Sequence, residues 1–159
     1  MKKTPSKRLT PRAIRAWQWA AAGGNLFVLG FPVLYFIFFG YKEHHLWLLI
    51  AVSIISVGYY LAGIAIIPYL RWRYWRYEID VHEIDLMRGV LIRRRTLIPL
   101  SRVQHVDTSQ GPILRWYKLA SVNISTAATT HEISALDEMI ADEVRNTIST
   151  YARLAEEDV

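Results

Sequence analysis

The sequence predicts a membrane α-helical hairpin followed by an α+β domain, in which an antiparallel β-sheet or partly open barrel is capped by a C-terminal amphipathic helix. Three observations predict this fold: two long uncharged runs, then short segments of alternating polarity, then an apolar stripe at helical spacing. The 159 residues suit about one soluble domain. We expect a basic tail at 1–15, the hairpin at 16–70, the α+β domain at 71–154 and an acidic tail at 155–159.

The charges are unevenly distributed along the chain. Residues 1–16 carry six basic side chains and no acid, residues 71–118 carry ten basic and five acidic, and residues 119–159 carry two basic and eight acidic. Basic segments can mark nucleic-acid binding, but they also mark the cytosolic flank of a membrane segment. The apolar runs favour the membrane, and no nucleic-acid-binding motif accompanies the charge, so we expect no nucleic-acid partner. The absence of Cys excludes disulfides, thiolate metal sites and cysteine nucleophiles.

The first uncharged run, residues 16–41, is 26 residues long. About 20 apolar residues cross a bilayer core as a helix, so this run is long enough to span. A secretory signal peptide is the competing interpretation, because basic residues precede the run. The run exceeds the apolar region of such a peptide (about 7–15 residues), and no clean cleavage site closes it. We therefore expect a retained membrane helix.

The second run, residues 46–70, has 25 uncharged residues after a short polar link at 40–45. So short a link allows only an antiparallel pair of helices. Basic residues flank the outer ends of both runs, and those after the second are Arg71, Arg73 and Arg76. The positive-inside rule then places both termini in the cytosol and the link outside, in a multi-pass protein. A role in setting the membrane topology is enough to account for these three arginines.

Small residues inside the second run could support helix packing. Gly58-x-x-x-Ala62 fits a small-x-x-x-small contact, which would make a homo-oligomer, although small residues are common in membrane helices in general. Neither run has an ionisable residue in its middle, and transporters and proton relays usually need such groups. The sequence therefore disfavours a channel or pump.

Short strands follow the second run. Alternating polarity predicts strands over 74–82, 83–88 and 90–100, with a turn at Arg88-Gly89. Pro99 limits the third strand to a sheet edge or to its own end, because proline cannot donate a ladder hydrogen bond.

The rest of the domain continues this pattern and ends in a helix. Ser134 before Asp137 resembles a capping box, which predicts a helix start there. The expected elements before it are strands over 102–109, 119–126 and 130–133, with a turn at 111–117. The expected apolar stripe of the helix is Leu136, Met139, Ile140, Val144, Ile148, Tyr151 and Leu154.

Several short motifs carry a resemblance to a known family: Tyr77-Glu78-Ile79, Arg88-Gly89-Val90-Leu91, Arg93-Arg94-Arg95, the run IPLSRVQHVD at 98–107, and Gln110-Gly111-Pro112. Together they resemble the bacterial pleckstrin-homology (PH) domain family, and more narrowly its YdbS-like membrane type, in which two membrane helices precede one such domain. The resemblance implies a PH-like domain, a partly open barrel with a helix at one end, on the bacterial cell membrane. It implies no ligand site.

The arginine cluster Arg88, Arg93, Arg94 and Arg95 is the candidate surface for lipid or a partner protein. Basic side chains beside an anionic membrane are attracted to it by about 1 kcal/mol each. In a regular strand Arg93 and Arg95 point to one face and Arg94 to the other, so only part of the cluster can meet one headgroup. A merely solvated sheet face is the alternative.

The sequence predicts neither a metal site nor catalysis. His44 and His45 are adjacent in the link and cannot easily both bind one ion, and the other three histidines lie on separate expected strands. We expect His105 to be a strand residue with a satisfied hydrogen bond, on the same face as Asp107. No motif for a nucleophile, a zinc site or a phosphate loop is present, so we expect no enzyme and no cofactor.

The expected function is that of a membrane-anchored, non-enzymatic PH-like module at the cytosolic face, acting as a scaffold or protein-interaction subunit of a membrane complex. Its partner would be a larger membrane protein with related PH-like domains, bound through a sheet edge or the arginine cluster. The alternative is a module that binds or senses anionic lipid of the bilayer.

Overall fold

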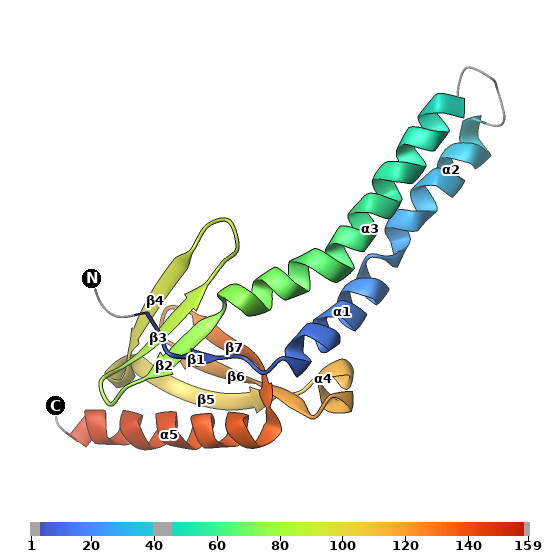
Figure 1. Cartoon of the computed structure of the whole chain (residues 1–159). Coiled ribbons are helices and arrows are strands. Elements are labelled where there is room, and N and C mark those ends of the chain that lie inside the picture. Colours follow the sequence, from blue (N-terminus) through green and yellow to red (C-terminus); the bar gives the residue numbers. More distant parts are fainter. Residues whose placement is uncertain (1–3, 40–45, 158–159) are drawn as a thin grey trace. The chain divides into compact units, whose positions relative to one another are not determined.

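The computed structural model describes residues 4–39 and 46–157 and divides the chain into two compact units (Figure 1). Ile14–Tyr69 form a helical unit, whereas Met1–Ala13 and Leu70–Val159 together form a β-rich unit. The division follows the sequence, because the uncharged runs lie in the first unit and the alternating segments in the second.

The first uncharged run is a bent pair of helices, not the single helix expected over 16–41. Helix α1 (Arg12–Gly24) is followed by a 3-10 turn η1 (Leu26–Leu29) and then by α2 (Gly30–Phe39). The two halves differ in direction by 43°, and only together are they long and apolar enough to cross a membrane. The expected link at 40–45, with His44 and His45, lies outside the described residues.

Asn25 accounts for the break between the two halves. Its side-chain amide donates to the Ala21 carbonyl at 2.9 Å, and its backbone N–H donates to the same carbonyl. The preceding Gly23 and Gly24 are weak helix formers, and Pro32 lacks the N–H that a continuous helix would need there. The length of the apolar run predicted a membrane-spanning segment but not this break, which depends on local hydrogen bonds.

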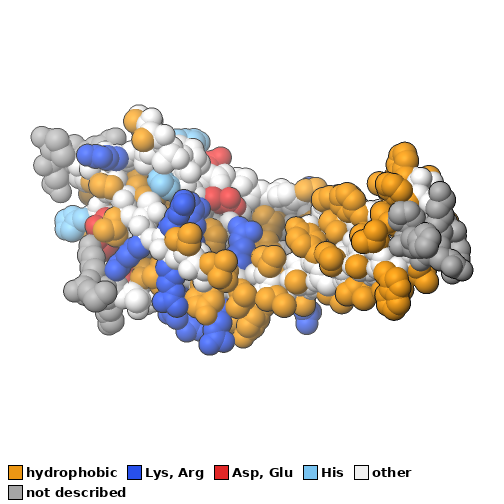
Figure 2. Space-filling view, turned by 90° about the horizontal axis from the view of Figure 1, so that it is seen from above, with side chains coloured by type: hydrophobic (Ala, Val, Ile, Leu, Met, Phe, Trp, Pro, Cys, Tyr) orange, Lys and Arg blue, Asp and Glu red, His pale blue; other side chains and the backbone are white. Residues whose placement is uncertain are grey.

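Helix α3 (Leu46–Tyr74) is continuous and ends four residues beyond the expected range of 46–70. It is the one described helix that is long and apolar enough by itself to cross a membrane, with a mean hydropathy of 2.2. Hydrophobic side chains cover most of the surface of the helical unit (Figure 2). A helix that is hydrophobic on all sides is typical of a membrane span or a protein core.

One face of α3 packs inside the helical unit. Ser56 and Gly63 are buried, and Tyr60 between them donates its hydroxyl to the Ala22 carbonyl at 3.4 Å. A Cβ atom at Gly63 would lie 3.4 Å from the Asn25 side chain, so this glycine allows close approach. Gly58, the small residue proposed for a contact between copies of the chain, has open space around it within this chain.

The first sheet contains four antiparallel strands in the order β1-β2-β3-β4. Strand β3 has the bounds expected from the sequence. Strand β4 begins later than the strand expected at 90–100, because residues 90–93 belong to the loop of the β3–β4 hairpin. Strand β2 is shorter than the strand expected at 74–82, and it starts later because Tyr74 still belongs to α3. The strands are β1 (Lys7–Arg8), β2 (Arg76–Ile79), β3 (Glu83–Arg88) and β4 (Arg94–Pro99).

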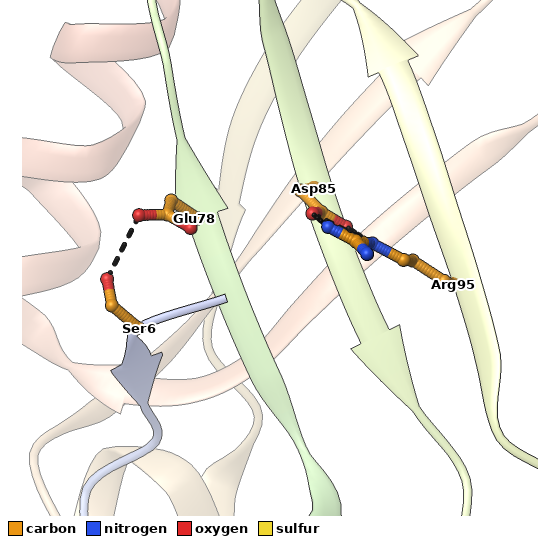
Figure 3. Close-up of polar contacts among 4 residues, drawn as sticks. All are labelled: Ser6, Glu78, Asp85 and Arg95. Atoms are coloured by element: carbon orange, nitrogen blue, oxygen red, sulfur yellow. Dashed lines mark hydrogen bonds and ion pairs between the residues drawn. The ribbon is translucent and has the colours of Figure 1, made fainter. Parts of the chain in front are cut away.

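The N-terminal segment is part of this sheet, although the sequence suggested only a basic tail. Lys7 and Arg8 pair with β2 in antiparallel register, and the Ser6 hydroxyl donates to the Glu78 carboxylate at 3.1 Å (Figure 3). The next residue, Leu9, is buried, and its carbonyl accepts a hydrogen bond from Trp72 Nε1 at 2.9 Å. Residues before and after the helical unit therefore share one folded unit.

The second sheet has three antiparallel strands in the order β5-β6-β7. A 3-10 turn η3 leads into it, and a short helix α4 joins its first two strands. Pro112 opens that helix, within the turn expected at 111–117. The elements are η3 (Leu100–Arg102), β5 (Val103–Ser109), α4 (Pro112–Trp116), β6 (Leu119–Thr126) and β7 (Thr130–Asp137).

The C-terminal helix α5 (Glu138–Glu157) starts later than expected, and the proposed cap at Ser134 and Asp137 is wrong. Both residues belong to β7, where the Ser134 hydroxyl donates to Glu132 at 2.9 Å. The helix turns Ala141, Val144 and Ile148 inward. Of the expected stripe, Leu136 is a buried strand residue, whereas Met139 is 85% exposed.

The core of the β-rich unit lies between the two open sheets and α5. Helix α5 packs against η3, β5, β6 and β7. The largest fully buried side chains of this unit are Pro5, Ile84, Ile98, Leu100, Leu119, Val122, Ile124, Ile133, Leu136 and Ile148. This core holds the β3–β4 hairpin and the edges of both sheets in place.

Candidate functional site

The four arginines of the expected surface lie on the β3–β4 hairpin but do not form one site. Arg88 and Arg94 are opposite each other in the register of the two strands, and both are exposed. Directly opposite residues in antiparallel strands project from the same face. Arg93 precedes β4, and its guanidinium carbon lies 5.2 Å from the centre of the Tyr74 ring.

Arg95 is bound to Asp85 of the neighbouring strand, so it is not a free cation (Figure 3). Its Nε lies 3.0 Å from each carboxylate oxygen of Asp85, and one terminal nitrogen of the guanidinium also donates to that carboxylate. The hydrogen bond to Asp85 raises the pKa of Arg95 above its ordinary value. Only Arg88, Arg93 and Arg94 remain for an external ligand.

The three membrane-flanking arginines lie where the apolar helix α3 meets the β-rich unit. Arg71 and Arg73 are in the last turn of α3, and Arg76 is the first residue of β2. The guanidinium carbon of Arg71 lies 5.4 Å from the centre of the Trp75 ring. Basic and aromatic side chains at the end of an apolar helix are typical of a membrane interface.

A groove that the sequence did not reveal opens between the edges of the two sheets. β4 is the last strand of the first sheet and β7 the last strand of the second, so each has one edge with no neighbouring strand in the described part of the chain. The groove has a volume of about 910 Å³. Its lining comes from β4, η3, the start of β5, the β6–β7 turn and β7: Leu97, Ile98, Pro99, Ser101, Arg102, Val103, Gln104, Thr126, Ala127, Ala128, Thr129 and His131.

His131 is the ionisable group of β7 in this groove. Partial burial lowers its pKa below the ordinary value of 6.5, and the positive charge of Arg88 lowers it further. The neutral imidazole is therefore favoured, which gives the groove an uncharged hydrogen-bonding side chain near neutral pH.

His105 is placed differently from what the sequence predicted. His105 does share a face of β5 with Asp107, as expected. The pairing register of β5 with β6, however, shifts between Val103 and His105. Val103 is consequently buried while His105 is exposed, and within the described residues the His105 side chain has no hydrogen-bond partner. Within residues 4–39 and 46–157, no three His, Asp or Glu side chains lie close enough together to hold a metal ion.

The bacterial PH domain family matches residues 20–152. The chain belongs to this family. The UPF0699 transmembrane protein YdbS of Bacillus subtilis is 38% identical over 163 aligned residues, which cover the whole of both chains. The UPF0699 transmembrane protein YdbT of the same bacterium is 26% identical over 89 residues, 56% of this chain but 18% of that relative. No solved structure matches the chain.

These comparisons confirm the family resemblance expected from the motifs. The β-rich unit is a PH-like domain with two open antiparallel sheets and a C-terminal helix. Because its full-length relative is named a transmembrane protein and α3 contains an apolar stretch long enough to cross a membrane, the chain is a bacterial PH domain membrane protein.

Proposed function

We propose that this chain is a non-enzymatic scaffold that holds a partner membrane protein at the cytosolic face of the plasma membrane. The observation that carries the proposal is the groove of about 910 Å³ between two free sheet edges. A free strand edge presents unpaired backbone N–H and C=O groups, which an extended segment of another protein can satisfy.

The β4 edge is the better docking strand of the two. Leu97 on this strand is 45% exposed and lines the groove, so a bound segment would cover an apolar side chain as well as backbone groups. Pro99 cannot donate a hydrogen bond, so pairing would be confined to the residues before it. The neutral His131 and the exposed Gln104 on the other walls would supply polar contacts that select the partner.

The partner that fits best is a larger membrane protein with related PH-like domains. Bacillus subtilis has a full-length relative of this chain and also a much longer relative, of which the matched segment is only 18%. Domains of common ancestry have similar strand edges, and similar edges can pair with each other. The longer relative therefore supplies an example of the expected partner class.

The N-terminal strand supports a two-span topology. β1 and β2 pair within one folded unit, so in this proposal the segments before and after the helical unit lie on the same side of the membrane. A single crossing by α3 would separate them, whereas a second crossing by the bent pair α1 and α2 would bring the chain back. The basic flanks of both runs favour the cytosol for that side.

Single cysteines can test this topology, because the chain has none of its own. Thr4→Cys and Asn146→Cys should both resist a membrane-impermeant maleimide in intact cells, whereas Glu43→Cys in the link should react. Reaction of Thr4→Cys together with Glu43→Cys would contradict the two-span arrangement.

The scaffold role is tested by crosslinking the tagged full-length protein in intact membranes and identifying the captured proteins by mass spectrometry. The proposal predicts one dominant adduct, a membrane protein with a PH-like segment. Leu97→Lys on the groove wall should abolish that adduct, while Met139→Lys, at an exposed hydrophobic site on α5, should not. Adducts that contain only further copies of this chain would refute the proposal.

A further inference from the structure

We propose that the tip of the β3–β4 hairpin, residues 89–93, inserts into the interface of an anionic phospholipid bilayer. Leu91 and Ile92 would enter the acyl boundary, while Arg88 and Arg94 contact headgroup phosphates. This site adds to the scaffold role, because the tip and the β4 wall of the groove are formed by opposite ends of β4. Arg88 beside the tip also acts electrostatically on His131 in the groove.

Leu91 and Ile92 are the side chains that make the tip apolar. Leu91 is 97% exposed and Ile92 is 74% exposed, and Leu91 is the most exposed large hydrophobic residue in the described part of the chain. Two adjacent aliphatic side chains projecting fully into solvent are unfavourable for a protein that keeps its apolar surface covered. A bilayer interface would cover both.

The shape of the tip is fixed by Gly89. Its φ angle is 118°, which side-chain-bearing residues rarely adopt, and a Cβ atom there would lie 1.9 Å from the Ile92 carbonyl oxygen. The loop therefore folds back tightly on itself at this point. The two aliphatic side chains are presented by a defined turn, so little conformational entropy is lost on insertion.

The charge around the tip matches an anionic surface. Arg88, Arg93 and Arg94 surround the apolar pair, and residues 86–106 contain no acidic residue. The nearest carboxylate on the hairpin, Asp85, is already bound to Arg95. Basic and hydrophobic side chains lie next to each other on the face of the β-rich unit shown in Figure 2. Apolar side chains with flanking arginines are typical of segments that lie in a membrane interface.

The position of the tip follows from its contact with the end of α3. Arg93 lies over the ring of Tyr74, the last residue of that helix, and both belong to the β-rich unit. If α3 leaves the bilayer near Arg71 and Arg73, Tyr74 lies at headgroup level. Leu91 and Ile92 directly precede Arg93 along the chain, so their Cα atoms lie within about 8 Å of that of Arg93, because consecutive Cα atoms are about 3.8 Å apart. On this proposal the tip would lie close to the headgroup region of the bilayer.

A fluorophore on a single cysteine tests the insertion in the full-length protein. We would label Leu91→Cys with an environment-sensitive dye and place the protein in nanodiscs of phosphatidylcholine alone or with added phosphatidylglycerol. Met139→Cys is the matched control, because Met139 is also highly exposed but lies on α5. Nitroxide-bearing lipids and aqueous iodide would serve as the two quenchers.

The proposal predicts that nitroxide lipid quenches the dye at position 91 several-fold more than the dye at 139, and that iodide does the reverse. Adding phosphatidylglycerol should strengthen the difference, and Arg88→Gln with Arg94→Gln should reduce it. Equal iodide quenching at both positions would overturn the proposal. A blue-shifted dye at 91 without nitroxide quenching would also overturn it, because a second copy of the chain would then cover the tip.

Discussion

Asp85 and Arg95 are bound to each other across strands β3 and β4, and the acid is the more buried of the two. Both carboxylate oxygens of Asp85 lie 3.0 Å from Arg95 Nε. The Asp85 side chain is 10% exposed, whereas that of Arg95 is 30% exposed. The arginine therefore supplies the hydrogen bonds that let a carboxylate remain inside the sheet.

Unequal burial predicts unequal costs when either partner is removed. Arg95→Gln leaves a buried carboxylate without its cation, whereas Asp85→Asn leaves a guanidinium that can still reach water. We expect Arg95→Gln to lower the melting temperature more than Asp85→Asn. The double variant Asp85→Leu with Arg95→Met should recover much of the loss, because neither charge remains. The same melting temperature for both single variants would contradict this account.

Gly89→Ala should destabilise the hairpin, because its backbone angle and the nearby Ile92 carbonyl both exclude a side chain. We expect a loss of about 1–3 kcal/mol in the free energy of unfolding. Gly111→Ala is the matched control: its φ is −73° and a Cβ atom there would meet nothing within 4 Å. The control should change stability by less than about 0.5 kcal/mol, and an equal loss in both variants would refute the role of Gly89.

Leu9→Ala should destabilise the PH-like domain, although it lies before the helical unit in sequence. Leu9 is 2% exposed and belongs to the β-rich unit. Truncating a buried leucine to alanine costs about 2–5 kcal/mol. Leu154→Ala, at a site that is 47% exposed, should cost far less. Thermal unfolding in detergent would measure both, and a neutral Leu9→Ala would show that the N-terminal segment is dispensable.

The stability of the domain should depend on pH through His131. Its pKa is lowered by partial burial and by Arg88, so the folded state binds a proton less readily than the unfolded chain. His131 thus costs no stability well above pH 6.5 and becomes destabilising as the pH falls below the unfolded value of 6.5. His131→Gln should flatten the loss of stability on going from about pH 7 to about pH 5. Identical pH profiles for the wild type and the variant would exclude this effect.

Alternating polarity predicted strand β3 with its correct bounds, although Ile84, Asp85 and Leu86 are all buried and the burial along this strand does not alternate. Strand β3 ends at Arg88, where Gly89 takes the left-handed conformation that the Arg88-Gly89 signal implied. The start of α5 was wrong for a tertiary reason. The register shifts between Ala120 and Val122, and opposite this irregularity Ala135 adopts a positive φ, which lets β7 continue through the segment expected to cap the helix.

Contacts between distant segments could not be predicted from local pattern. The β1–β2 pairing joins residues about 70 positions apart, and the Arg95–Asp85 pair depends on the hairpin register. The groove is lined by β4, η3, β5, the β6–β7 turn and β7, which only the tertiary fold brings together. The sequence identified the four arginines, but only the structure shows that Arg95 is bound to Asp85 whereas Arg88, Arg93 and Arg94 are not.

Site-specific crosslinking tests the scaffold role most directly. A photoreactive residue would replace Leu97 or Gln104 on the groove, and Met139 on α5 as the control, in the full-length protein in native membranes. The account predicts that both groove positions capture the same membrane protein with a PH-like segment and that position 139 does not. No adduct at the groove, or the same adducts at all three positions, would contradict it.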